Sequence, residues 1–122
     1  MTKPEDKLST DFKAACKAIG PALKATRIEA RNTALGIPDW FLLFQGKIIL
    51  VELKVIKTKG AKINYTPAQE LFLGDAAEQR APVYVLAKNL QDKSYYRVDF
   101  LTNMRYCISD SLENAVKQIL VT

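Results

Sequence analysis

The segment DWFLLFQGKIILVELKVI, residues 39–56, most restricts what this 122-residue chain can fold into. Two apolar runs meet at Gln45-Gly46, and glycine at the second position of a two-residue turn is typical of a β-hairpin. We therefore predict antiparallel strands over Asp39–Phe44 and Lys47–Ile56. A hairpin this apolar belongs to the buried part of a larger sheet.

Apolar residues at helical spacing, together with capping residues, predict three helices: Leu8–Ile19, Thr66–Arg80 and Ser109–Val121. Ser9 or Thr10 can cap the first helix. The second helix has the clearest start, because Thr66 is followed by Pro67 and by Gln69 at the capping-box position.

Four further segments read as strands: 25–32, 82–88, 95–101 and 105–108. In the first, Arg27, Glu29 and Arg31 alternate along one face. The second, PVYVLAK, is apolar almost throughout, which is typical of a central buried strand. The order of elements predicts a single α/β domain over residues 1–122, with a central mixed β-sheet flanked by helices.

Composition excludes several kinds of site. Lys and Arg number 18 against 13 acids, a net charge of +5, which permits an anionic partner without requiring one. There is no histidine, which removes Ser-His catalysis and histidine-ligated metals. We expect Cys16 and Cys107 to be buried as small hydrophobic residues. No signal peptide or membrane span is recognisable, so we expect a cytoplasmic protein.

The predicted hairpin brings three charged residues together. With a turn at Gln45-Gly46, Asp39 lies opposite Glu52, with Cβ atoms about 4.5–5.5 Å apart. Lys54 lies on the same face, roughly 6.5–7 Å further along the strand. Opposed carboxylates repel each other unless a cation lies between them. This pattern indicates a site for a hard divalent ion such as Mg²⁺ or Mn²⁺.

A simpler interpretation treats these charges as ordinary surface residues. Asp39 would cap a turn after Pro38, and Glu52 and Lys54 would face solvent on an edge strand. Two observations count against it. The strand around Glu52 is apolar on both faces, and the register places Glu52 opposite another acid rather than a base.

The chain resembles PD-(D/E)XK nucleases. The signature is Pro38-Asp39 followed by Glu52-Leu53-Lys54. Within this superfamily, the chain resembles the virus-type replication-repair group, VRR-Nuc, in three motifs: GIPD, VELK and a helix that opens with TPAQ. The resemblance covers roughly residues 9–88, and Holliday-junction resolvases share this core layout. Stand-alone versions of similar size are typical of bacteriophages, so a phage-encoded protein would lie in the host cytoplasm.

The resemblance implies roles for individual residues. Asp39 and Glu52 would hold the metal with the Leu53 backbone carbonyl, and Lys54 would position or activate the attacking water. Gln69 matches a glutamine that faces the active site in the family, although its place in a capping box is sufficient explanation by itself. Hydrolysis would leave 5′-phosphate and 3′-hydroxyl ends.

Related nucleases often carry a glutamate on the first helix that reaches the metal through water. Here Ser9 occupies one position where that acid is expected. Asp11 and Glu29 are the nearest candidates, and Glu29 can equally pair with Arg27 or Arg31.

Basic residues near the proposed site are candidates for phosphate contacts: Arg27, Arg31, Lys57, Lys59 and Lys62. Tyr65 can stack on a base or sugar, or pack in the core. The leading hypothesis is a metal-dependent DNA endonuclease, structure-specific on branched DNA and acting as a homodimer because paired nicks need two sites. The alternatives are a non-catalytic nucleic-acid-binding protein on the same fold and a structural or inhibitor protein. RNA is not excluded as a substrate.

Overall fold

The structure, a computed structural model, describes residues 3–28, 36–58 and 60–122. Six strands form one sheet, and their order in the sheet is their order along the chain. The elements are α1 (Pro4–Ile19), β1 (Lys24–Arg27), β2 (Trp40–Phe44), β3 (Lys47–Ile56), α2 (Pro67–Glu78), β4 (Val83–Asn89), β5 (Tyr95–Val98), β6 (Arg105–Ser109) and α3 (Leu112–Leu120).

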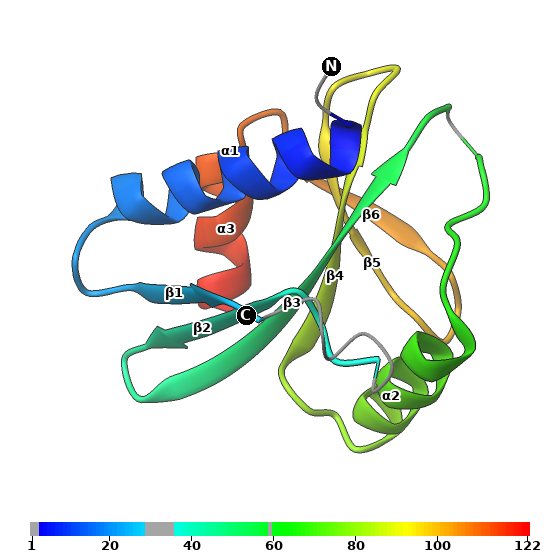
Figure 1. Cartoon of the computed structure of the whole chain (residues 1–122), viewed down its shortest axis with the longest axis horizontal. Coiled ribbons are helices and arrows are strands. Elements are labelled where there is room, and N and C mark those ends of the chain that lie inside the picture. The colour runs from blue at the N-terminus through cyan, green and yellow to red at the C-terminus, as the bar shows by residue number, and fades with distance from the viewer. Residues whose placement is uncertain (1–2, 29–35, 59) are drawn as a thin grey trace.

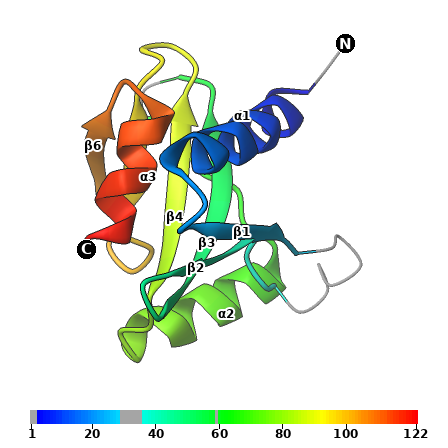
Figure 2. The ribbon, with the colours of Figure 1, turned by 90° about the vertical axis from the view of Figure 1, so that its left-hand side faces the viewer.

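The sheet is mixed and lies between two helical layers. Neighbouring strands are antiparallel except β3 and β4, which are parallel and connected through α2. Figure 1 shows α1 and α3 over one face of the sheet and α2 over the other, and Figure 2 shows the same layers from the side. The predicted fold class, a central mixed sheet flanked by helices, is confirmed.

Each face of the sheet has its own hydrophobic cluster. The larger one joins α1 and α3 to the sheet and contains Phe12, Trp40 and Val116. The smaller one lies beneath α2 and contains Leu73 and Val85. Because β3 and β4 are covered on both faces, their sequences are apolar almost throughout.

The hairpin forms in the predicted register. Gln45 and Gly46 both have positive φ angles, 51° and 77°, as a two-residue turn of type I′ requires. The ladder pairs Phe44 with Lys47 and continues to Trp40 opposite Val51. The next position in the same register is Asp39 opposite Glu52.

The first helix begins earlier than predicted, at Pro4 instead of Leu8. Proline favours the first helical position because its φ angle is already helical and its missing N–H is not needed there. Ser9 and Thr10 therefore lie inside α1 rather than capping it. The Ser9 side chain is buried, and the Thr10 hydroxyl donates to the Asp6 carbonyl at 3.0 Å.

The second helix begins as predicted, with Thr66 as its N-cap and Pro67 in its first turn. The strand predicted from residue 25 begins at Lys24, and its continuation through Glu29 and Arg31 lies outside the described residues. Within the described ranges, no helix combines the length and the apolar composition needed to cross a bilayer.

The two cysteines differ from each other. Cys16 is buried on the side of α1 that faces the sheet, as expected, and burial raises the pKa of its thiol to about 12. Cys107 is exposed, which contradicts the expectation. It lies on β6, an edge strand, next to Ile108, which packs against the cluster beneath α1 and α3. Side chains alternate along a strand, so Cys107 projects from the other face.

Gly36 lets the segment before Asp39 pack directly against α2. Its φ angle is +71°, and a Cβ atom there would lie 2.1 Å from the Ala68 carbonyl oxygen. Only glycine allows so close an approach between two backbones. This contact fixes the position of the Gly36–Asp39 segment relative to the first turn of α2.

We expect Gly36→Ala to destabilise the fold more than Gly60→Ala, its matched control. Gly60 also has a positive φ angle, +82°, but a Cβ there meets nothing within 4 Å. The control should lose about 1–2 kcal/mol from backbone strain alone. The Gly36 variant should lose about 1–3 kcal/mol more from overpacking. Urea unfolding would measure both, and equal losses would show that the close packing does not constrain the fold.

Candidate active site

Asp39 lies where β1 and β2 come together. Its backbone carbonyl accepts a hydrogen bond from the Ile28 N–H at 2.8 Å, which extends the pairing of the two strands by one position. Its carboxylate Oδ2 accepts a hydrogen bond from the Leu53 backbone N–H at 3.1 Å. The side chain is therefore directed at β3 rather than at a turn after Pro38.

Glu52 and Lys54 lie on β3, which has β2 on one side and β4 on the other. The interpretation that places them on an edge strand is therefore wrong. Their neighbours Val51 and Leu53 belong to the hydrophobic cluster beneath α1 and α3. Because side chains alternate along a strand, Glu52 and Lys54 face the α2 layer. The Lys54 Nζ lies 3.6 Å from Glu52 Oε2.

Gln69 connects this pair to α2. Its Nε2 donates to Glu52 Oε2 at 3.1 Å, and its Oε1 accepts from Lys54 Nζ at 3.1 Å. The same Oε1 accepts from the Thr66 backbone N–H at 3.0 Å, while the Thr66 hydroxyl accepts from the Gln69 N–H at 3.1 Å. The two interpretations of Gln69 are compatible, because one side-chain amide completes the capping box and also contacts both charged residues.

The Lys54 ammonium has two further neighbours. It donates to the Asn64 carbonyl at 2.8 Å and lies 5.0 Å from the centre of the Tyr65 ring. Tyr65 also packs edge-on against Phe100, with ring centres 5.2 Å apart, so packing accounts for part of its role. The sequence did not indicate Asn64, because its contact uses a backbone carbonyl that any residue supplies.

Glu52 is an acid in an unfavourable position. It is only 3% exposed, and its Oε1 is buried without a hydrogen-bond partner among the described residues. Burial is the main reason that its pKa is raised to about 7, and the nearby Asp39 charge adds to the effect while Lys54 opposes it. The positive charge near Glu52 is therefore too small to offset the effects of burial and of Asp39 on its ionised form.

The residues present fit a hard divalent cation. A cation between Asp39 and Glu52 would relieve their repulsion and give the orphaned Glu52 oxygen a partner. The Leu53 N–H points toward Asp39, and a strand residue directs its N–H and C=O to the same side. The Leu53 carbonyl therefore faces the same region, as the predicted ligand set requires.

The protein would supply only part of such a coordination shell. Among the described residues, no three His, Cys, Asp or Glu side chains gather in a group that could hold a metal. Two carboxylates and a carbonyl leave positions for water and substrate oxygens. This is the way Mg²⁺ is usually bound in proteins, because it retains several waters and also binds substrate phosphates.

The other predicted residues fall in three groups. Asp11 forms an ion pair with Lys7 at 3.0 Å. Burial raises the pKa of Tyr95, and the charge of Asp11 adds to this rise while that of Lys7 opposes it. Neither charge contributes to the raised pKa of Glu52. The exposed candidates for phosphate contacts are Arg27, Lys57 and Lys62. The candidates outside the described residues are Glu29, Arg31 and Lys59.

Arg105, which the sequence analysis did not indicate, fixes the loop after β3. Its guanidinium on β6 donates a hydrogen bond to the Ala61 carbonyl. The loop that carries Lys57 and Lys62 is thus attached to the far edge of the sheet. No pattern around Arg105 distinguishes it from other surface arginines.

No protein-family model and no curated protein sequence matches this chain. Among solved structures, the chain is similar to Hjc, a Holliday junction resolvase from the archaeal hyperthermophile Archaeoglobus fulgidus. The alignment has a TM-score of 0.54 and 15% sequence identity, and it covers 97% of this chain and 99% of that one. The two proteins share a fold over nearly their whole lengths.

We expect Glu52 to make stability fall as pH rises in metal-free buffer. Its pKa is higher in the folded state, about 7 against 4.5, so the folded protein binds the extra proton. Stability should therefore decrease between pH 4.5 and 7, by up to roughly 3 kcal/mol for a shift of this size. Urea unfolding in EDTA would measure this decrease against Glu52→Gln, which lacks the titration. Parallel profiles for the two proteins would contradict it.

We expect Gln69→Ala and Thr66→Ala to separate the two roles of Gln69. Each removes part of the capping box and should cost about 0.5–1 kcal/mol of stability. Only Gln69→Ala also removes the contacts to Lys54 and Glu52. Cleavage of DNA, the activity that the resemblance implies, should therefore fall roughly tenfold or more in that variant alone, as expected for a misplaced catalytic group. Equal activity in both variants would leave Gln69 as a capping residue only.

Proposed function

We propose that this protein is a divalent-metal-dependent DNA endonuclease that hydrolyses phosphodiester bonds in branched DNA such as Holliday junctions. One observation supports this most strongly. A sheet of the fold found in Hjc places the buried Glu52 within reach of Asp39, Lys54 and Gln69. A contribution to folding stability does not explain why two carboxylates and an ammonium lie together here, because burial makes the Glu52 charge unfavourable.

The chemistry divides between the ion and the protein. A bound Mg²⁺ or Mn²⁺ would supply Lewis acidity, which polarises the phosphate and lowers the pKa of the attacking water. Asp39, Glu52 and the Leu53 carbonyl would hold the ion. The Asp39 carboxylate is already oriented by the Leu53 N–H. The water oxygen would form a bond to phosphorus while the bond from phosphorus to the 3′ oxygen breaks.

Lys54 is suited to act on the attacking water or on the charge that develops at phosphorus. Its ammonium is held by Asn64 and Gln69 and lies near, but not in closest contact with, Glu52. A positive charge fixed beforehand stabilises a developing negative charge without reorganisation during the reaction. Gln69 is then a positioning residue, since its contacts are with Lys54 and Glu52.

Resolution of a four-way junction requires two nicks. The described residues of one chain contain one such constellation, so we infer that two copies act together as a homodimer on a symmetric substrate. The preference for branched over linear DNA would then depend on the distance and orientation between the two sites, because phosphate contacts by themselves do not distinguish DNA structures or sequences.

We expect Asp39→Asn to abolish cleavage of a labelled four-way junction in Mg²⁺ or Mn²⁺, because it removes a charge that holds the ion. Lys54→Ala should lower the rate roughly 10²–10⁴-fold while DNA affinity changes little. Thr66→Ala is a suitable control, since it alters a neighbouring residue outside the proposed catalytic group.

The assay should run beside linear duplex, single-stranded DNA and RNA. Cleavage by Asp39→Asn at the wild-type rate would refute the metal site. Wild-type protein that binds junctions but never cleaves any of these substrates would support the non-catalytic alternative.

A further inference from the structure

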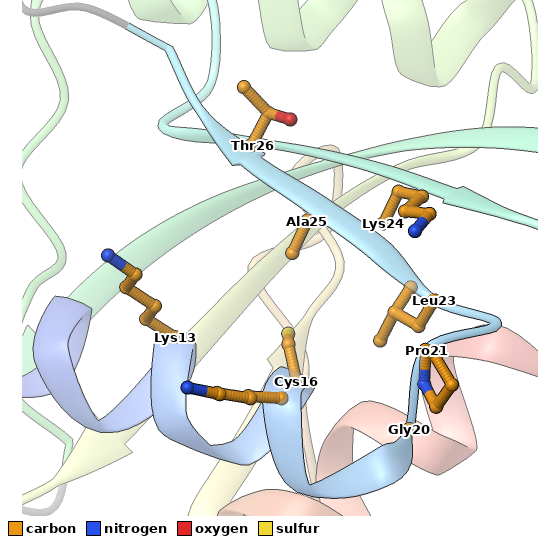
Figure 3. Close-up of a pocket in the computed structure, with 9 residues that line it drawn as sticks. Lys13, Cys16, Gly20, Pro21, Leu23, Lys24, Ala25 and Thr26 are labelled. Atoms are coloured by element: carbon orange, nitrogen blue, oxygen red, sulfur yellow. The ribbon is translucent and has the colours of Figure 1, made fainter.

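A hollow lies between α1 and β1, on the side of the molecule away from α2. Its volume is about 530 Å³. Figure 3 shows Cys16 and Ala25 pointing toward each other across it, with Lys13 extending from the helix on one side. A second hollow of about 520 Å³ continues from it, since the two share Lys13, Ala25 and Thr26. The two adjoining hollows are called here the α1–β1 groove.

The charged residues of this groove all have the same sign. The cations on the groove side are Lys13 and Lys17 from α1 and Arg27 from β1, and the lining contains no acid. Lys24 and Thr26 adjoin the groove through the β1 backbone, but their side chains point to the other side of that strand (Figure 3). Ser9 and Thr10 add polar groups.

Within the part of the chain that the structure describes, no ion pair neutralises these cations. The ion pairs among the described residues are Lys7–Asp11 and Lys54–Glu52, and neither includes a residue of the groove. Lys13 and Lys17 are four residues apart on α1, a spacing at which like charges repel and destabilise a helix. Bound phosphates would relieve this repulsion.

One end of the groove lies beside the segment that carries Asp39. This end is formed by Arg27 and Trp40, which are paired across β1 and β2. The next residue before Trp40 is Asp39, whose carbonyl is bonded to the Ile28 N–H. Trp40 belongs to the cluster beneath α1, so the Asp39 side chain lies on the opposite face. The groove and the site therefore lie on opposite faces of the sheet and come near each other at the end of β1, an edge strand around which a DNA backbone can pass.

We propose that the α1–β1 groove binds the phosphate backbone of the DNA strand that enters the active site, and that it is the main binding surface rather than the Lys57–Lys62 loop. This inference rests on the proposed function for its substrate. Lysine and arginine beside hydroxyl groups form the set of donors that usually contacts DNA phosphates. Binding through such contacts is independent of sequence and strongly dependent on salt.

The test compares two triple variants that lose the same charge. The groove variant is Lys13→Gln, Lys17→Gln and Arg27→Gln, three exposed residues on the groove side. The control is Lys57→Gln, Lys62→Gln and Lys117→Gln, all exposed in the structure. Fluorescence anisotropy with a labelled four-way junction in EDTA would give affinity as a function of KCl concentration without cleavage.

We expect the groove variant to flatten the slope of log K against log salt by about 2.7 units, at 0.9 per phosphate contact. Between 50 and 200 mM salt, wild-type affinity should then fall about 40-fold more than that of the variant. The control should keep a slope near the wild-type value. Circular dichroism and thermal unfolding verify folding, and the three single variants, each expected to flatten the slope by about 0.9 units, test the groove if the triple variant does not fold.

The outcomes distinguish this inference from the proposed function. An unchanged slope in a folded groove variant, or flattening confined to the control, would overturn the groove even if the wild type cleaves DNA. Absence of junction binding by the wild type would overturn it as well. Groove-dependent binding by a wild-type protein that never cleaves would support the groove and refute the nuclease.

Discussion

The register of the β2–β3 hairpin is the constraint on which the candidate site depends. Side chains alternate along a strand, so a slip of one residue would turn Glu52 and Lys54 into the cluster beneath α1 and α3. It would also turn Val51 and Leu53 out of that cluster. The type I′ turn at Gln45-Gly46 and the burial of β3 on both faces exclude such a slip. The hydrophobic pattern thereby fixes the position of the charges.

The candidate site lowers the stability of an otherwise apolar region of the sheet. Burial raises the pKa of Glu52 to about 7, and one of its oxygens lacks a partner. A paired or hydrogen-bonded buried acid is tolerated, whereas an incompletely satisfied one destabilises the protein. Stability and the proposed metal binding therefore oppose each other at one side chain. A hydrophobic residue at position 52 would be expected to improve packing and remove the site.

The sequence was most informative where one short pattern determines local geometry. The glycine turn gave the hairpin register, and Thr66-Pro67 with Gln69 gave the start of α2, because both depend on neighbouring residues. It was less informative about features made by distant segments. The Asn64 carbonyl beside Lys54 has no side-chain signature, and the exposure of Cys107 depends on which strand lies at the edge. The α1–β1 groove depends on how α1 packs beside an edge strand, which periodicity does not specify.

The shared amide of Gln69 links two events that are usually separate, the fraying of a helix end and the disordering of an active site. Helix termini open locally at a free-energy cost far below that of global unfolding. When the first turn of α2 opens, the Gln69 side chain leaves Lys54 and Glu52 at the same moment that it leaves Thr66. The population of closed first turns then sets an upper limit on the fraction of molecules in which the candidate site is assembled. Hydrogen exchange at the Gln69 backbone amide would report that fraction directly, since this N–H is bonded to the Thr66 hydroxyl only while the turn is closed.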